Sequence, residues 1–296
     1  MKQSVKGSLY LLSATAIWGF SFIAQSVGME NLGPFTFQAF RCGLAVIFLA
    51  LAILVVELPK KGFVGFLRGW ANRRLWLAGL ACGAALTVAA SLQQIGILYE
   101  TAGKSGFITA MYIVLVPILG IFFWQKPPKS AWISVFLAVI GLYLLSNMGT
   151  PGAFNKGDFF LIACAFGFAI QILVISKVSP GLDPARLNCI QALVVTIFSI
   201  PFIAATERFS FADVLSSWFP LVFAGVFSMG VAYTLQIAGQ QRLNPTAASL
   251  MMCLESVFAA LGGWLFLRET MTTKELFGCT LVLTAVILVQ FPDKRT

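Results

Sequence analysis

One acidic residue, Glu255, lies near the middle of an apolar stretch about as long as a membrane is thick. The stretch, residues 244–271, reads NPTAASLMMCLESVFAALGGWLFLRETM, and a membrane-spanning helix needs about 20 apolar residues. Asn244 and Pro245 are typical of a first helical turn, because asparagine caps a helix and proline lacks an N–H that would be unbonded there. A carboxylate at such depth is costly in lipid, so Glu255 is predicted to face protein or water.

Two charged residues inside apolar stretches, Glu255 and Arg41, are candidates for binding or coupling. Glu255 could bind a substrate amine, or bind a proton and the substrate in turn, which makes protons a candidate coupling ion. The alternative is a protonated carboxyl that only donates a hydrogen bond within the bundle. Arg41 lies about 9 Å from the end of its span at 1.5 Å per residue, so it either joins the same site or extends to the membrane interface.

Polar and aromatic side chains also interrupt several other apolar stretches. Trp18, Ser21 and Gln25 are spaced i, i+3, i+7, which places them on one face of a helix. Buried glutamines often only join helices, and aromatic rings often only pack. The residues predicted to bind substrate are Trp18, Ser21, Gln25, Gln93, Tyr112, Phe168, Gln171, Tyr233, Gln236 and Glu255.

The composition excludes several classes of protein. Hydrophobic residues make up 59% of the chain and charged residues 10%, whereas soluble domains carry about 25% charged residues. The chain has no histidine, and its six cysteines show no CxxC spacing, so we expect no metal site, cofactor or catalytic residue. The net charge of +9 is interpreted as a membrane topology signal and not as nucleic-acid binding.

Apolar run lengths predict an all-α integral membrane protein with ten transmembrane helices. Fourteen of the 20 Lys and Arg residues fall on one predicted side and five on the other. The positive-inside rule therefore places both termini in the cytoplasm. The spans are predicted at roughly 8–25, 35–56, 75–99, 105–124, 130–148, 159–176, 187–206, 214–241, 245–267 and 276–292.

Weak internal repeats relate the two halves of the chain. Pro34 aligns with Pro184 at an offset of 150 residues, and Gly96 aligns with Gly239 at an offset of 143. The second offset also makes Tyr112 the partner of Glu255. Residues 1–150 and 151–296 are thus predicted to be two repeats within one bundle. Each holds five spans, an odd number, so the second repeat must be inverted, as in alternating-access transporters.

The segment 57–74, ELPKKGFVGFLRGWANRR, is too charged to cross a membrane. Phe63, Phe66, Leu67 and Trp70 recur at helical spacing. The segment is predicted to be an amphipathic turn at the inner leaflet, or a basic loop that simply obeys the charge rule.

Three motifs resemble those of the EamA-type, ten-span members of the drug/metabolite transporter superfamily. They are ATAIWGFSF at 14–22, AGKSGFITAMYIVLVP at 102–117 and NPTAASLMMCLESVFAALGGWLFLRE at 244–269. Ser256 stands where the family usually has proline, so the resemblance does not predict a kink there. The resemblance implies a transporter in the bacterial cytoplasmic membrane, in contact with lipid, acting as an exporter, and either a monomer or a weak dimer.

The predicted site favours a small neutral or zwitterionic organic solute, such as an amino acid, carried through a central cavity. A lipid or lipid-linked sugar flippase and a multidrug efflux carrier are the alternatives. A membrane enzyme would need a nucleophile with a base, or clustered acids, and one mid-span carboxylate without histidine provides neither.

Overall fold

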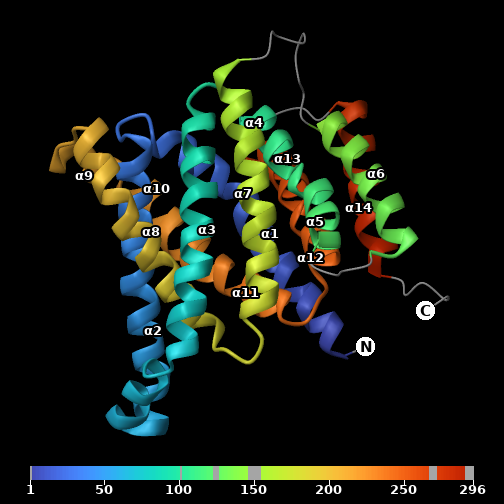
Figure 1. Ribbon diagram of the computed structural model, residues 1–296. Coiled ribbons are helices and arrows are strands. Elements are labelled where there is room, and N and C mark those ends of the chain that lie inside the picture. The colour runs from blue at the N-terminus through green and yellow to red at the C-terminus, as the bar shows by residue number, and fades with distance from the viewer. Residues whose placement is uncertain (1, 101, 123–126, 146–154, 267–271, 291–296) are drawn as a thin grey trace.

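The computed structural model describes residues 2–100, 102–122, 127–145, 155–266 and 272–290, and the regular structure in these ranges is helical. The helices form one bundle (Figure 1). They are α1 (Lys2–Gly28), α2 (Pro34–Trp70), α3 (Arg73–Ile97), α4 (Ala102–Ala110), α5 (Tyr112–Phe122), α6 (Lys129–Leu145), α7 (Lys156–Val178), α8 (Pro184–Thr206), α9 (Phe211–Ser216), α10 (Trp218–Val222), η1 (Phe223–Ala232), α11 (Tyr233–Gln240), α12 (Pro245–Met252), α13 (Leu254–Phe266) and α14 (Thr273–Gln290).

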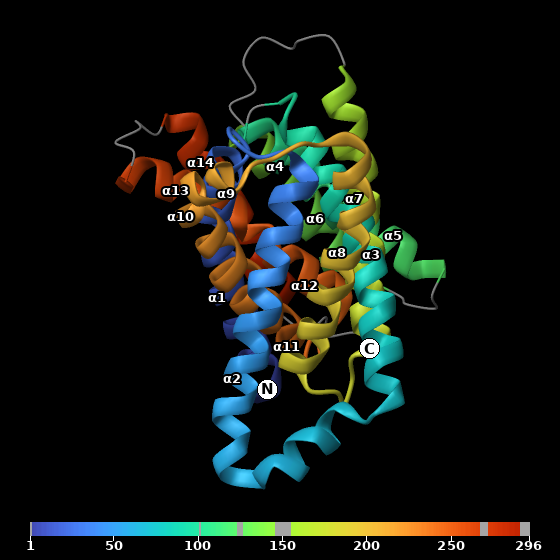
Figure 2. The same ribbon diagram turned by 90° about the vertical axis from the view of Figure 1, so that its left-hand side faces the viewer.

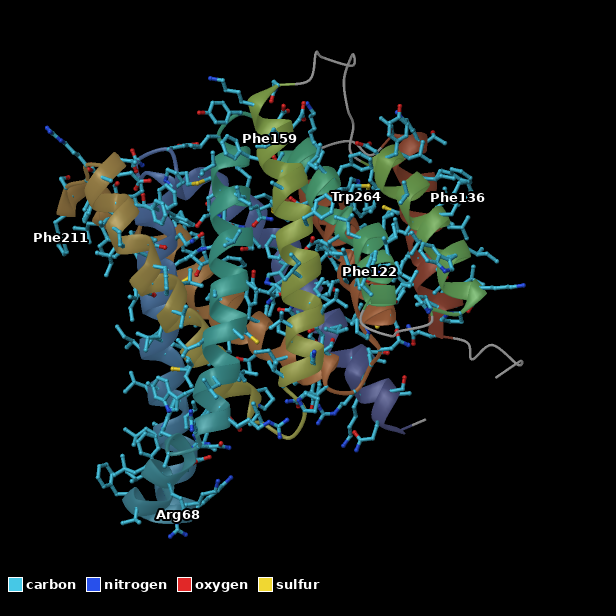
Figure 3. All side chains as sticks on the ribbon, in the orientation of Figure 1. Arg68, Phe122, Phe136, Phe159, Phe211 and Trp264 are labelled. Carbon is cyan, nitrogen blue, oxygen red and sulfur yellow. The ribbon has the colours of Figure 1, made fainter. Side chains whose placement is uncertain are left out.

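The helices confirm a polytopic membrane protein. Within the described residues, eight helical segments are long and apolar enough to cross a membrane, and two shorter apolar helices, Lys129–Leu145 and Pro245–Leu261, complete the predicted order. Large apolar side chains point outward, as Phe122, Phe136 and Phe159 do in Figure 3, where lipid would cover them. All six cysteines are buried and free.

Helix neighbours follow the repeat. The most extensive helix contacts join the two halves of the chain: α3 packs on α7, α6 on α14, and α2 on α8. The packing of α3 on α7 has its counterpart in the packing of α1 on α11 and η1. Exchanging the halves therefore largely preserves the packing, as expected of two inverted repeats in one bundle.

Local sequence explains where several helices begin. The side chain of Asn244 accepts a hydrogen bond of 2.7 Å from the backbone N–H of Ala247, which confirms the predicted cap of α12. Asp183 caps α8 in the same way, with 2.8 Å to the N–H of Arg186. Pro184 and Pro245 occupy the first helical positions, where no N–H is needed.

Two spans are interrupted near their middle, at positions that match to within one residue under the offset of 143. The first break, at Met111, separates α4 from α5, and the second, at Cys253, separates α12 from α13. Tighter turns bridge both breaks: Val114 N–H donates to Met111 O at 3.0 Å, and Ser256 N–H donates to Cys253 O at 3.2 Å. A kink-forming proline at position 256 is therefore not needed for the second break.

A third irregularity lies in the span that faces α1 and α2. Its middle, η1, is a π-helix, in which each N–H bonds five residues back rather than four. The amide of Asn188 on α8 inserts here and donates to the carbonyls of Met229 and Gly230, at 2.8 and 3.1 Å. Insertion of a side chain into the helical ladder is a common cause of such distortion.

Candidate functional site

A single cavity collects the polar side chains that the sequence singled out. It has a volume of about 50 Å³ and lies between helices of both halves. Every predicted substrate-binding residue lines it except Gln171, and Arg41 lines it too. The full lining is Trp18, Ser21, Phe22, Gln25, Arg41, Gln93, Thr109, Tyr112, Phe168, Ile172, Ser228, Tyr233, Gln236, Met252 and Glu255.

Arg41 and two glutamines form a polar cluster on one side of the cavity. The guanidinium Nη1 of Arg41 donates to Gln25 Oε1 at 2.8 Å, and the amide of Gln94 donates to the same oxygen. Gln25 in turn donates to the backbone carbonyl of Ser21 at 3.2 Å. The side chain of Arg41 is 4% exposed, and its Nε has no hydrogen-bond partner among the described residues. The cluster therefore presents a buried positive charge that no carboxylate of the described chain neutralises.

Glu255 lies apart from Arg41, within hydrogen-bonding reach of the phenol of Tyr112. Its side chain is 7% exposed. Tyr112 is the first residue after the break between α4 and α5. Glu255 lies two residues after Cys253, where α12 and α13 are separated. Interrupted helices beside a mid-membrane site are typical of transporters with inverted repeats. Here the backbone groups at both interruptions keep hydrogen bonds within their own span, so the side chains of Tyr112 and Glu255 are the groups that can contact a solute.

Aromatic rings form another part of the wall. The rings of Trp18 and Tyr233 meet edge to face, with centroids 5.0 Å apart. Tyr112 and Phe168 lie 6.5 Å apart in a similar arrangement. The indole Nε1 of Trp18 is buried without a hydrogen-bond partner in the described chain, so it is a donor still available to a solute.

Gln171 lies behind the wall instead of in it. Its Oε1 accepts a hydrogen bond of 3.3 Å from the amide of Gln236, which does line the cavity. Gln171 is fully buried. Its contact can fix the orientation of Gln236, so the structure connects Gln171 to the cavity through Gln236, and its role in substrate binding stays a prediction.

Five lining residues were not predicted, and four of them form two repeat-related pairs. Phe22 and Ile172 are 150 residues apart, and Thr109 and Met252 are 143 apart, the same two offsets that relate the halves. They were missed because three of the four are apolar and none carries a charge. Helical spacing would have found them, because each lies three or four residues from a predicted residue of its own span, whereas Ser228 lies in the π-helix, five residues before Tyr233.

Comparisons with known proteins decide the family. The EamA-like transporter family matches residues 5–147 and again residues 155–291. The chain belongs to this family.

Relatives agree with the EamA assignment. An "Uncharacterized transporter" of Archaeoglobus fulgidus is 31% identical over 95% of this chain and 84% of its own length. The "Uncharacterized transporter YoaV" of Bacillus subtilis is 22% identical over 98% of this chain and 99% of its own. A solved crystal structure, 13% identical, superposes with a TM-score of 0.79 over 96% of both chains, which shows a shared fold.

This EamA protein is therefore a transporter. Within the described residues no group of three His, Cys, Asp or Glu side chains could hold a metal ion. What the cavity does present is one cation, one carboxyl group, neutral amides and aromatic faces. These groups can bind and release a solute through hydrogen bonds, charge and stacking.

Proposed function

We propose that this EamA protein exports a small neutral or zwitterionic organic metabolite, such as an amino acid, by alternating access. The observation that carries the proposal is the cavity, which takes polar residues from both halves of the chain. In this proposal residues 1–150 and 151–296 act as two repeats that rock around the site. Both termini face the cytoplasm.

A zwitterion fits the charges of the cavity best. Arg41 and Glu255 both line it, yet they form no ion pair with each other. A solute that carries a carboxylate and an amine can offer each of them an opposite charge, which compensates the cost of keeping them buried. The volume of about 50 Å³ is below the roughly 300–1,000 Å³ of pockets that hold drug-sized ligands, which favours a small solute over a multidrug carrier.

Glu255 is the proposed coupling residue. A carboxyl inside a membrane protein can exchange a proton for a bound amine, because either one neutralises it. Tyr112 lies beside it and can hydrogen-bond the carboxyl in either form. A proton entering from one side would thereby release the solute to the other.

A lipid flippase is the second candidate, favoured by an apolar groove on the outside of the bundle. The groove has a volume of about 630 Å³ and is lined by α2 and α8 residues, with Phe40, Gly43 and Thr196 among them, and by Phe209. It shares no lining residue with the central cavity. In the part of the chain that the structure describes, the lining of the groove holds no charged residue that could bind a headgroup, so the solute carrier is the better supported function.

Counterflow in liposomes tests the proposal without knowledge of the coupling ion. Purified protein is reconstituted in vesicles loaded with an unlabelled amino acid mixture, and uptake of each labelled amino acid is measured. We expect saturable uptake that Trp18→Ala abolishes and that Glu30→Gln, which changes an exposed carboxyl just after α1, leaves intact. Translocation of a labelled lipid headgroup without solute flux would instead support the flippase.

A further inference from the structure

The last part of α2 leaves the membrane-spanning direction and crosses the end of the bundle. Non-helical torsion angles at Gly62, with φ of +66°, bend the helix, and Pro59 precedes the bend. A positive φ is easily reached by glycine alone. The residues that follow, Phe63–Trp70, run sideways from α2 toward α3 at the end that carries the N-terminus (Figure 2). We call Leu58–Trp70 the foot.

The foot exposes both apolar and cationic side chains. Phe63, Val64 and Leu67 are 60%, 75% and 49% exposed. Lys60 and Arg68 are exposed as well, and Arg68 points away from the bundle in Figure 3. Arg73 and Arg74 follow directly, whereas the foot itself contains no acidic residue.

Contacts hold the foot in place, so its exposure is not that of a free loop. The carboxylate of Glu57, just before the foot, accepts a hydrogen bond of 2.9 Å from Arg186 of α8. The guanidinium of Arg186 also lies 5.4 Å from the ring centre of Trp70. The carbonyl of Trp70 accepts 2.7 Å from the indole of Trp76 at the start of α3. Both ends of the foot are thus fixed to spanning helices.

We propose that the foot binds the headgroups of anionic phospholipids. Its place at the end of two spanning helices puts it at the level of one membrane surface. An amphipathic helix there buries its apolar side chains at the edge of the acyl region and leaves its cations among the headgroups. Arg74 donates to the carbonyl of Pro180 at 3.0 Å. Because Glu57 is already held by Arg186, the exposed cations Lys60, Arg68 and Arg73 have anionic lipid as the complementary partner.

Native mass spectrometry of the full-length protein tests this assignment. The protein is equilibrated in mixed micelles that contain either phosphatidylglycerol or phosphatidylcholine, and retained lipids are counted. The test variant is Lys60→Gln with Arg68→Gln. The matched control is Lys156→Gln with Arg208→Gln, two exposed cations at the opposite end of the bundle. Each cation removed from the foot is expected to weaken phosphatidylglycerol retention by about fivefold.

The parent and the control should retain phosphatidylglycerol in preference to phosphatidylcholine, and the test variant should lose that preference. A second variant, Val64→Ser, changes a side chain that the described residues leave 75% exposed and should weaken retention of both lipids. Melting curves check that all variants are folded. Equal loss in test variant and control, or no preference in the parent, would overturn the proposal. If the test variant lost phosphatidylglycerol retention only after cytosolic protein was added, the foot would bind a protein partner. That result would also overturn the proposal that it binds lipid headgroups.

Discussion

Glu57 and Glu207 fasten opposite ends of the same pair of helices, α2 and α8. Glu207 accepts hydrogen bonds of 2.8 Å from the backbone N–H groups of Phe35 and Thr36 in the first turn of α2. Glu57 accepts from Arg186 in the first turn of α8, at 2.9 Å. The two carboxylates are 150 residues apart, the offset of the repeat. Each carboxylate therefore joins α2 to α8 at one end of this helix pair, and its repeat-related counterpart joins them at the other end.

Replacing Glu207 with glutamine should destabilise the protein. The carboxylate takes three donors at the start of α2, the third being the hydroxyl of Thr36 at 2.6 Å, and a neutral amide accepts them less well. We expect a loss of about 1 kcal/mol, typical of a helix N-cap, measured as a lower melting temperature. Glu30→Gln, an exposed carboxyl, is the control and should have no effect. Equal melting temperatures for both variants would contradict the assignment.

Breaking the Glu57–Arg186 pair should lower the stability of the protein more than breaking the neighbouring, more exposed Glu57–Lys61 pair. Arg186→Gln leaves Glu57 partly buried without its main partner, at a cost of about 1–3 kcal/mol. Lys61 also contacts Glu57 at 3.1 Å, but its side chain is 57% exposed, so Lys61→Gln should change little. In a double-mutant cycle, Glu57→Gln with Arg186→Gln should cost less than the sum of the single changes. Additive effects would mean that the pair is not coupled.

Glu255→Gln should separate folding from transport. The amide keeps the shape of the side chain and can still hydrogen-bond Tyr112, so the melting temperature should change little. Because the amide can neither take up a proton nor neutralise an amine, uptake in liposomes should be lost, or should lose its pH dependence between about pH 5.5 and 8.5. Parent-like uptake at every pH would reduce Glu255 to a packing residue.

The topology can be tested with single cysteines, because all six native cysteines are buried. Asn31 and Ala212 are exposed at one end of the bundle and Lys61 at the other. Impermeant thiol reagents should label cysteines at Asn31 and Ala212 from outside intact cells, and not one at Lys61. Asn155, also exposed, caps α7, so a cysteine there should label and also lower stability. Labelling at Lys61 would reverse the orientation.

The sequence predicted the spans because lipid imposes a length and a composition that run lengths reveal. It also predicted most of the cavity, since polar groups inside apolar stretches must converge on protein or water. The breaks at Met111 and Cys253 could not be predicted, because neither carries a proline or glycine and their geometry depends on neighbouring helices. The same holds for η1, where Asn188 comes from a different span. In 57–74, periodicity indicated an amphipathic turn, and the structure continues α2 as a bent helix.

The length of the π-helix η1 affects which side chains face the cavity. Each hydrogen-bonded ring of η1 encloses one residue more than a ring of an α-helix. Because a residue of a π-helix turns the chain by a different angle than a residue of an α-helix, the length of η1 sets the direction in which Tyr233 and Gln236, which follow it in α11, face the cavity. Which groups meet the solute is therefore set by a count of residues as well as by their identity. An insertion or deletion in this segment could change substrate selectivity in one step.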